Sequence, residues 1–328
     1  MKVLNSHMEF KLQFDVKPPE TRINISEDIL LIGSCFAENI GIRLIENKFK
    51  SLINPNGILF NPISILNAIK SYKDEKIFSD NDLFFFNELW HSWEHHGDFS
   101  DMEKGNVIAK INTSQQQASF HFNKAKHIVI TFGSAYVYEL NDTKNIVANC
   151  HKFPQQNFTK RILSVDEIIE AFDNSGMANE QKQIILTVSP VRYLRDGLIE
   201  NNLSKSVLIQ AVHELVKKYN HIFYFPAYEI VIDELRDYRF FEDDFLHPNK
   251  LAVDYVWERF VETIFDEETK NIGKEISKII HAKNHKPFNR LTKSHQLFLE
   301  NYLAITKSLA IKYPLLQLEN ELNYFAQK

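Results

Sequence analysis

Glycine and cysteine are both scarce in this chain of 328 residues, which contains nine glycines and two cysteines. Loops that cradle nucleotide phosphates need closely spaced glycines, and neither a G-x-x-x-x-G-K nor a G-x-G-x-x-G pattern occurs. The two cysteines, Cys35 and Cys150, are too few for a disulfide framework, which is typical of a reducing compartment. The composition therefore argues against a nucleotide-cradling loop and against a disulfide-stapled fold.

A basic excess and long apolar runs are also absent. The chain has 38 Lys and Arg against 43 Asp and Glu, a net charge of −5, whereas nucleic-acid binding needs a basic surface. No stretch approaches the roughly 20 apolar residues that cross a bilayer. Residues 1–20 carry charges and Pro18-Pro19 but no apolar core of a signal peptide. We therefore expect a cytoplasmic protein with no membrane span and no nucleic-acid partner.

Hydrophobic residues make up 44% of the chain, enough for a sizeable core. Short continuous apolar runs, rich in β-branched and aromatic residues, predict parallel strands buried on both faces. They lie at 29–32, 128–132, 184–188 and 222–225. Segments with helical periodicity lie between and after them, at 38–49, 63–72, 102–125, 165–174, 204–218 and 250–266. This alternation predicts a doubly wound, three-layer α/β/α fold.

Two insertions and a tail depart from this alternation. An aromatic-rich insertion at 83–97 predicts a hairpin or a rim element, and 136–140 and 145–148 predict a second hairpin around a turn at Asn141-Asp142. After residue 267 the chain is rich in Lys and Leu, with helical spacing at 272–281 and 294–313. We divide the chain into an N-terminal segment (1–23), an α/β domain (24–267) and a helical extension packed on it (268–328).

The first candidate for chemistry is Ser34, which follows the 29–32 run and precedes a helical stretch. At the carboxyl edge of a parallel sheet, a serine hydroxyl lies near the positive end of a helix dipole and is placed to act as a nucleophile. The alternative is a structural N-cap, a position that serine favours. For the neighbouring Cys35 the alternatives are a reactive thiolate and a small buried residue, of which we favour burial.

Asp244 and His247 supply the partners that a serine nucleophile needs. At a spacing of i, i+3 within one turn, the carboxylate can bind Nδ1 of the imidazole and leave the other ring nitrogen free to take a serine proton. An apolar periodic run begins at Leu251, so His247 is expected on a loop that leads into a helix. A D-x-x-H pair is weak by itself, but together with Ser34 it predicts a Ser–His–Asp triad.

Together these segments resemble the GSCFA family, a branch similar to the SGNH (GDSL-like) hydrolases. The resemblance spans about residues 24–260. It implies a flavodoxin-like SGNH-hydrolase fold. The segments that carry it are 33–37 (GSCFA), 54–62 (NPNGILFNP), 131–136 (TFGSAY), 149–152 (NCHK), 189–192 (SPVR), 202–206 (NLSKS) and 244–249 (DFLHPN).

The resemblance also implies roles. Ser34 corresponds to the nucleophile, Asp244 and His247 to the last block, and Gly57 to a glycine whose N–H helps form an oxyanion hole with that of Ser34. The third block, normally G-x-N-D, aligns with Gly133-Ser134-Ala135-Tyr136 and lacks its asparagine. Asn149 and Ser134 are rival donors in its place, and we favour Asn149 because an amide is the better oxyanion donor.

Further candidates would contact the substrate rather than react with it. Trp93, His95 and His96 are expected to line a pocket mouth, and His151 and Lys152 belong to a family-like segment. Arg192 is expected either to bind a substrate anion or to form a structural ion pair, and Lys152 has the same two interpretations. No metal site is expected, because a convincing third and fourth ligand are missing.

The predicted activity is that of a serine-dependent esterase or O-acyltransferase acting through an acyl-enzyme, without a cofactor. The family analogy suggests a small acyl group, such as acetyl on a carbohydrate. The alternative is a non-catalytic binding domain for a carbohydrate or another ligand on the same scaffold, because the third-block asparagine is missing. The sequence leaves open the acyl group, the acceptor, the choice between hydrolysis and transfer, and the oligomeric state.

Overall fold

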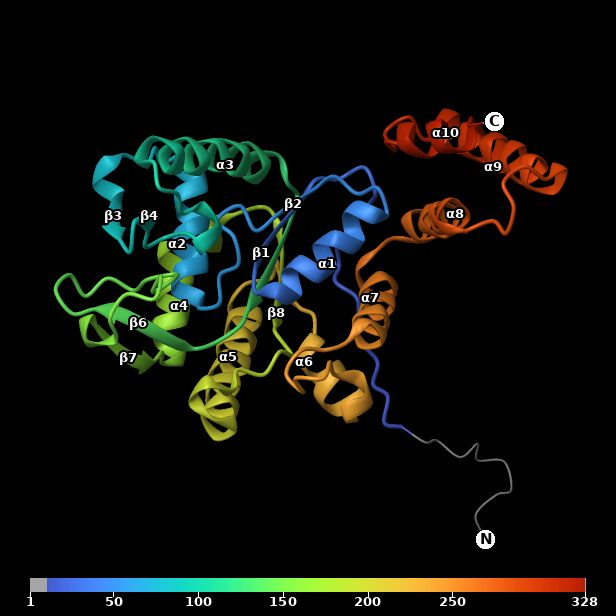
Figure 1. The fold of residues 1–328 in the computed structure, drawn as a ribbon. Coiled ribbons are helices and arrows are strands. Elements are labelled where there is room, and N and C mark those ends of the chain that lie inside the picture. Colours follow the sequence, from blue (N-terminus) through green and yellow to red (C-terminus); the bar gives the residue numbers. More distant parts are fainter. Residues whose placement is uncertain (1–10, 328) are drawn as a thin grey trace, which may run out of the picture.

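A five-stranded parallel sheet forms the centre of the computed structural model, which describes residues 11–327 (Figure 1). The strand order is β2-β1-β5-β8-β9, or 2-1-3-4-5 along the chain, which is the order of flavodoxin-like doubly wound sheets. The predicted parallel α/β sheet is confirmed. Its strands are β1 (Ile29–Gly33), β2 (Ser51–Ile53), β5 (His127–Phe132), β8 (Gln183–Val188) and β9 (Ile222–Tyr224).

Helices cover both faces of the sheet, which explains why the strands read as continuous apolar runs. Leu30 and Ile32 of β1 belong to one core, whereas Ile29 and Leu31 belong to the other. The first core is covered by α2 (Pro62–Lys73), α3 (Lys104–Lys124), α4 (Val165–Asn174) and α5 (Leu198–Lys218). The second is covered by α1 (Cys35–Glu46), α6 (Ala227–Glu229) and α7 (Lys250–Ile264).

The insertion after α2 is a hairpin, as predicted. Its strands β3 (Leu83–Phe86) and β4 (Leu89–Ser92) pair antiparallel.

Single helical turns lie on the loops, six of them 3-10 and the last a π-helical turn: Asp80–Asp82, Gly97–Phe99, Gln155–Asn157, Met177–Asn179, Leu194–Asp196, Tyr238–Phe240 and Ile230–Leu235.

The second predicted hairpin has a different partner strand. β6 (Tyr136–Leu140) pairs antiparallel with β7 (Phe158–Ile162), and the segment 145–148 contributes only an isolated bridge between Ile146 and Glu139. The predicted contact between 136–140 and 145–148 is therefore present, with the Leu140 N–H donating to the Asn145 carbonyl and the Val147 N–H to the Tyr138 carbonyl, both at 3.0 Å, but the strand that pairs along the whole of β6 is β7. The physical reason is that this segment also serves the first insertion, because the Ala148 N–H donates to the Trp93 carbonyl at 2.8 Å.

The helical tail that the sequence predicts is present and consists of α8 (Glu267–Asn284), α9 (Lys293–Lys312) and α10 (Glu319–Phe325). Ile272 and Ile276 of α8 are buried in the same core as α1 and α7. Glu321 of α10 pairs with Lys48, just beyond α1, at 2.8 Å and with Lys283 of α8 at 2.9 Å. Apolar packing and ion pairs thus join the tail to the face of the domain that α1 covers.

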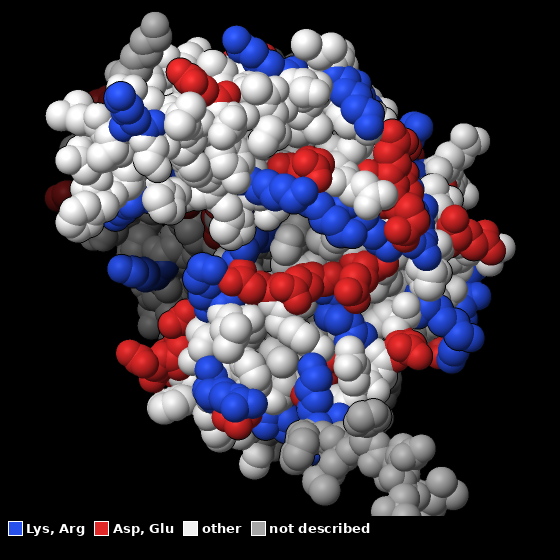
Figure 2. All heavy atoms as spheres, turned by 90° about the vertical axis from the view of Figure 1, so that its right-hand side faces the viewer, with Lys and Arg blue, Asp and Glu red and all other residues white. Residues whose placement is uncertain are grey.

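Acidic and basic side chains are interleaved on the side of the molecule that the tail occupies (Figure 2). Examples along α8 are the pairs Lys270–Glu267 and Lys278–Glu275, with N–O distances of 2.8 and 2.7 Å. The face in view therefore offers no broad surface of one charge to a polyanion. Within residues 11–327, no helix combines the length and the apolar character needed to cross a membrane.

Candidate active site

Ser34 lies directly after β1 and caps α1. β1 sits beside β5 at the point where the strand order reverses, the usual ligand position in an open α/β sheet. The Phe36 N–H donates to Ser34 Oγ at 3.3 Å, so the predicted N-cap interpretation is confirmed. A hydroxyl can accept in a cap and still donate its own proton, so capping and nucleophilic roles are compatible. The residue is only 1% exposed.

Gly33 brings the chain into this position. Its φ of +142° lies in the region that favours glycine, and a Cβ at this residue would overlap the Thr131 carbonyl oxygen on β5. Two hydrogen bonds fix the turn: the Gly33 N–H donates to Asn54 Oδ1 at 2.9 Å, and the Ser34 N–H donates to the Thr131 carbonyl at 3.3 Å. The glycine of the pentapeptide is therefore a steric requirement of the strand–helix junction.

Asp244 and His247 form the pair that their spacing predicts. His247 Nδ1 lies 2.6 Å from Asp244 Oδ2, and the backbone N–H groups of Leu246 and His247 donate to Oδ1 at 2.8 and 3.0 Å. These donors, led by the His247 backbone and ring, lower the pKa of Asp244 to about 2. The ring is thus oriented by an ionised carboxylate, and both side chains are about half exposed.

Arg192 holds this turn at the sheet edge. Its backbone N–H donates to the Leu246 carbonyl at 3.1 Å, and its guanidinium donates to the Phe245 carbonyl at 3.0 Å. The guanidinium also lies 4.1 Å from the centre of the Phe241 ring. The structure thus engages Arg192 within the protein, through carbonyls and aromatic faces rather than through an ion pair. It links the loop after β8 to the loop before α7.

The two halves of the predicted triad are not hydrogen bonded to each other. Among residues 11–327, no bond joins Ser34 Oγ to the His247 ring, and Nε2 of that ring has no hydrogen-bond partner. Ser34 is buried at the start of α1, whereas His247 is exposed on its loop. The proton path from serine to histidine is therefore not assembled in this arrangement.

Both backbone donors expected for an oxyanion hole are already engaged. The Gly57 N–H donates to the Asn54 carbonyl at 2.7 Å in a tight turn, and the Ser34 N–H is bonded to β5. Gly57 has a φ of +75°, and a Cβ there would overlap Cβ of His96. In this arrangement, Gly57 allows the insertion to pack against the turn, and neither N–H is free for a substrate.

Of the rival side-chain donors, Ser134 is the more committed. Its hydroxyl accepts from the Tyr136 N–H at 3.1 Å and lies 3.3 Å from Ser204 Oγ. Asn149 accepts from the His151 N–H through Oδ1 at 2.8 Å, which leaves its NH₂ group without a hydrogen-bond partner in the described part of the chain. The amide of Asn149 is thus the freer donor.

Asn54, in the segment 54–62, is a further candidate for which the sequence predicted no role. Its Oδ1 accepts from the Gly33 N–H, whereas its Nδ2 is buried and has no partner within residues 11–327. Its φ of +45° is in the left-handed region, although it precedes Pro55, a place where extended backbone is favoured. A strained residue with an unused buried donor beside Ser34 fits a functional site. In the sequence, the tripeptide Asn54-Pro55-Asn56 is the feature that could have indicated this residue.

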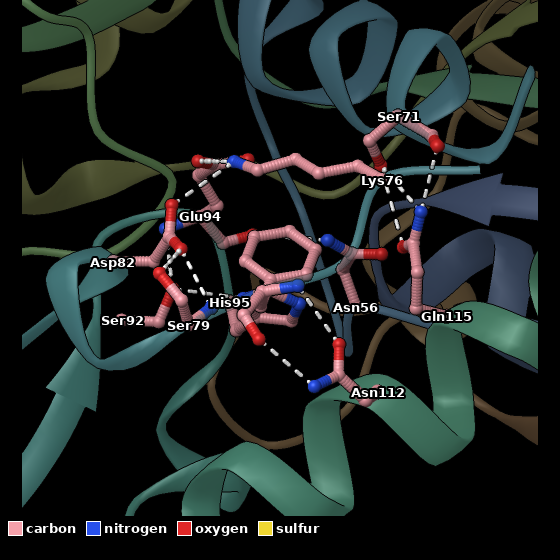
Figure 3. A network of polar contacts seen from close by, with 11 residues as sticks. Asn56, Ser71, Lys76, Ser79, Asp82, Ser92, Glu94, His95, Asn112 and Gln115 are labelled. Carbon is pink, nitrogen blue, oxygen red and sulfur yellow. Dashed lines mark hydrogen bonds and ion pairs between the residues drawn. The ribbon is translucent and has the colours of Figure 1, made fainter. Parts of the chain in front are cut away.

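His95 proves to be an internal residue of the insertion (Figure 3). It is 1% exposed, its Nδ1 lies 2.9 Å from Ser92 Oγ, and its ring packs against Phe78 and Phe99 at centroid distances of 4.9 and 5.0 Å. Burial lowers its pKa to about 3. Its ring has no access to a ligand here, which is contrary to the expected position at a pocket mouth. The neighbouring Lys76 forms an ion pair with Glu94, with its Nζ 2.6 Å from Oε1.

His151 and Lys152 follow Asn149 with left-handed backbone, at φ values of 47° and 58°. His151 Nε2 lies 2.8 Å from the Ser92 carbonyl, and burial lowers the pKa of this histidine to about 4. Lys152 is exposed. Residues 11–327 contain no group of three or more His, Cys, Asp or Glu side chains arranged to hold a metal ion.

Cys35 is the alternative nucleophile, and its surroundings disfavour the thiolate. Burial, followed by the charge of Glu38, raises the pKa of the thiol above its ordinary value. A thiol in this state is protonated at neutral pH. Cys35 itself has intermediate exposure, so the burial that we favoured at this position is present only in part.

The sequence matches the models of two known families. The model of the GSCFA family matches residues 28–260, and that of the C-terminal domain of GSCFA domain proteins matches residues 276–328. The first match ends within α7 and the second begins within α8, so residues 261–275 lie between them. No curated protein and no solved structure matches the chain. Because the first match spans more than half of its length, the chain belongs to the GSCFA family.

Proposed function

We propose that this protein is a serine-dependent acyl-ester hydrolase or O-acyltransferase in which Ser34 is the nucleophile. The observation that carries the proposal is the hydrogen bond of 2.6 Å between Asp244 and His247, on a loop bound to the end of β8. Ser34 follows β1 in the same parallel sheet, so both lie on loops at its carboxyl edge. The similarity of the sequence to SGNH hydrolases supports the same assignment of roles.

In the proposed reaction, Nε2 of His247 takes the hydroxyl proton of Ser34 while Oγ bonds to the ester carbonyl carbon. The C–O bond to the leaving alcohol then breaks, and the imidazolium returns its proton to that alcohol. Water or an acceptor hydroxyl attacks the acyl-enzyme with His247 again as the base, and the proton is returned to Ser34. Asp244 fixes the ring and stabilises its charged form. The buried position of Ser34 requires local opening before this sequence begins.

The negative charge of the tetrahedral intermediate needs hydrogen-bond donors. Within residues 11–327, the NH₂ groups of Asn54 and Asn149 have no hydrogen-bond partner and are candidates for this role. We assign the role to Asn54 first, because its Oδ1 is already bonded to Gly33. A small acyl group, such as acetyl on a carbohydrate, is the substrate class that the family resemblance suggests.

Labelling with a fluorophosphonate probe tests the proposal. We expect the full-length protein to be labelled at Ser34, Ser34→Ala and His247→Ala to lose the label, and Cys35→Ala and the exposed control His285→Ala to keep it. Turnover of p-nitrophenyl acetate should follow the same pattern. Absence of both labelling and turnover in the folded wild type would overturn the enzymatic proposal.

A non-catalytic ligand-binding domain is the second candidate. It is favoured by the engaged N–H groups of Ser34 and Gly57 and by the 1% exposure of Ser34. In that case Ser34→Ala would cost only the helix cap, about 1 kcal/mol of stability, and would leave ligand binding intact. A glycan-array measurement with the wild type and Ser34→Ala separates this candidate from the enzyme.

A further inference from the structure

Lys205 is a buried lysine that the proposed reaction does not use. It lies on the second turn of α5 and is 2% exposed. Its Nζ donates to the Gly133 carbonyl at 2.6 Å and to the Ser189 carbonyl at 2.7 Å. Gly133 is the first residue after β5, and Ser189 is the first after β8. One side chain therefore joins the carboxyl ends of two adjacent strands.

The same face of α5 holds the neighbouring loops. Asn201 Oδ1 accepts from the Tyr193 N–H at 2.9 Å, and Ser204 Oγ accepts from the Ala135 N–H at 2.7 Å. These two bonds are made to neutral groups and need no charge. Lys205 differs from these two residues, because burying its ammonium group costs desolvation energy. A neutral side chain of similar size could fill the same space without that cost.

No carboxylate compensates this lysine. Within residues 11–327, no Asp or Glu oxygen lies within 4 Å of Nζ, and the turns after β5 and β8 face it with carbonyl oxygens. Cys35 of α1, the residue after Ser34, is near enough for its charge to act on the pKa of Lys205. Burial lowers the pKa of Lys205 to about 7. Uncompensated buried charge of this kind is concentrated at functional sites.

We propose that Lys205 is a positioning residue for the Ser34 site: its ammonium group fixes the turns after β5 and β8 and places a positive charge behind the start of α1. The inference rests on the proposed function of Ser34 as a nucleophile. The negative charge that balances this ammonium group would be the oxyanion of the tetrahedral intermediate, which forms only during the reaction. The ammonium acts through the turns and through its field, without touching the substrate.

The experiment compares Lys205→Met with Lys217→Met, a matched control on the exposed end of the same helix. The readout is the rate constant for fluorophosphonate labelling of Ser34 in the full chain. We expect Lys205→Met to lower this rate constant by about tenfold or more, and Lys217→Met to leave it unchanged. Circular dichroism and the melting temperature show whether each variant is folded.

The pH profile separates positioning by charge from a structural role. If the ammonium is needed, the rate constant for labelling of the wild type falls as the pH rises through about 7, and Lys205→Met lacks this decline. A purely structural role predicts a lower rate with an unchanged profile, and that result would overturn the proposal. Lys205→Gln, which keeps a donor for the carbonyls without the charge, should behave like Lys205→Met.

The two proposals can fail separately. If the wild type is not labelled at Ser34 at any pH, the enzymatic function fails and Lys205 has no reaction to support. If the wild type is labelled and Lys205→Met is labelled at the same rate and with the same pH profile, only the inference about Lys205 fails.

Discussion

The Asp244 carboxylate binds His247 twice, once through the ring Nδ1 at 2.6 Å and once through the backbone N–H at 3.0 Å. One side chain therefore sets both the position of the histidine and the ring nitrogen that carries its proton. The other nitrogen, Nε2, is left as the acceptor that a general base needs.

Asp244→Asn tests this relationship. An amide can still hold the ring, but it favours the wrong tautomer and no longer stabilises the imidazolium. We expect the rate constant for labelling of Ser34 to fall by about 100-fold or more, with little change in melting temperature because the pair is exposed. The neighbouring, exposed Asp243→Asn is the matched control and should match the wild type. Equal rates for the two variants would remove Asp244 from the site.

The pH below which the Asp244–His247 pair is lost follows from the pKa of Asp244, which its hydrogen bonds lower to about 2. Because the pKa of Asp244 is lower in the folded protein than its ordinary value, the Asp244–His247 pair stabilises the fold at a pH above that ordinary value. The contribution is lost as the pH falls through about 2. In carbon-detected NMR titration, we expect the Asp244 carboxyl signal to move at a lower pH than that of a model aspartate. A midpoint near 4 would contradict the ionised, hydrogen-bonded state.

Substitutions of Asn54 separate its two roles. Asn54→Asp keeps the acceptor for the Gly33 N–H and removes the unused donor, whereas Asn54→Ala removes both. We expect Asn54→Asp to label at Ser34 about tenfold or more slowly, and to lose stability because it buries a carboxylate oxygen that has no partner. Asn54→Ala should also lose about 1–3 kcal/mol of stability, because a buried donor is left unpaired and alanine tolerates positive φ poorly. Unchanged labelling of Asn54→Asp would assign the oxyanion role elsewhere.

Two glycine substitutions with opposite expected signs test the strand–helix junction. Gly33→Ala places a Cβ against the Thr131 carbonyl at a φ of +142° and should cost about 3 kcal/mol or more. Gly105→Ala lies in α3, where no atom is within 4 Å of an added Cβ. It should stabilise the fold by about 0.5–1 kcal/mol. Urea denaturation measures both, and a neutral Gly33→Ala would contradict the steric requirement.

Lys205 should also leave a signature in the dependence of stability on pH. Its folded-state pKa of about 7 lies below the ordinary lysine value, so the unfolded chain binds the extra proton between the two values. The wild type should therefore gain stability relative to Lys205→Met as the pH rises from about 7 to about 10, by an amount on the order of 4 kcal/mol. Parallel denaturation curves at three pH values measure this difference. A constant difference would contradict a neutralised lysine.

The parts of this protein that could be predicted are those encoded locally. The runs in β1, β5 and β8 are continuous and apolar because helices bury both faces of the sheet. The bond between Asp244 and His247 follows from a spacing within one turn. The cap at Ser34 follows from a serine between a strand and a helix.

The remaining features depend on contacts between distant segments. β2 has only three residues, too few for a recognisable pattern, and exists because β1 is beside it. β7 pairs with β6 across a long connection, whereas the nearer segment at 145–148 docks on Trp93. His95 and Lys205 look like ordinary polar residues in the sequence, and only the packing around them shows that they are internal.

The ion pair between Lys48 and Glu321 joins the segment that matches the GSCFA family model to the segment that matches the C-terminal domain model. Lys48 lies just beyond the end of α1. The helix is a stiff rod about 18 Å long, with Ser34 at one end and the contact with α10 just beyond the other. This ion pair therefore ties the C-terminal helices to the end of α1 that lies farthest from Ser34.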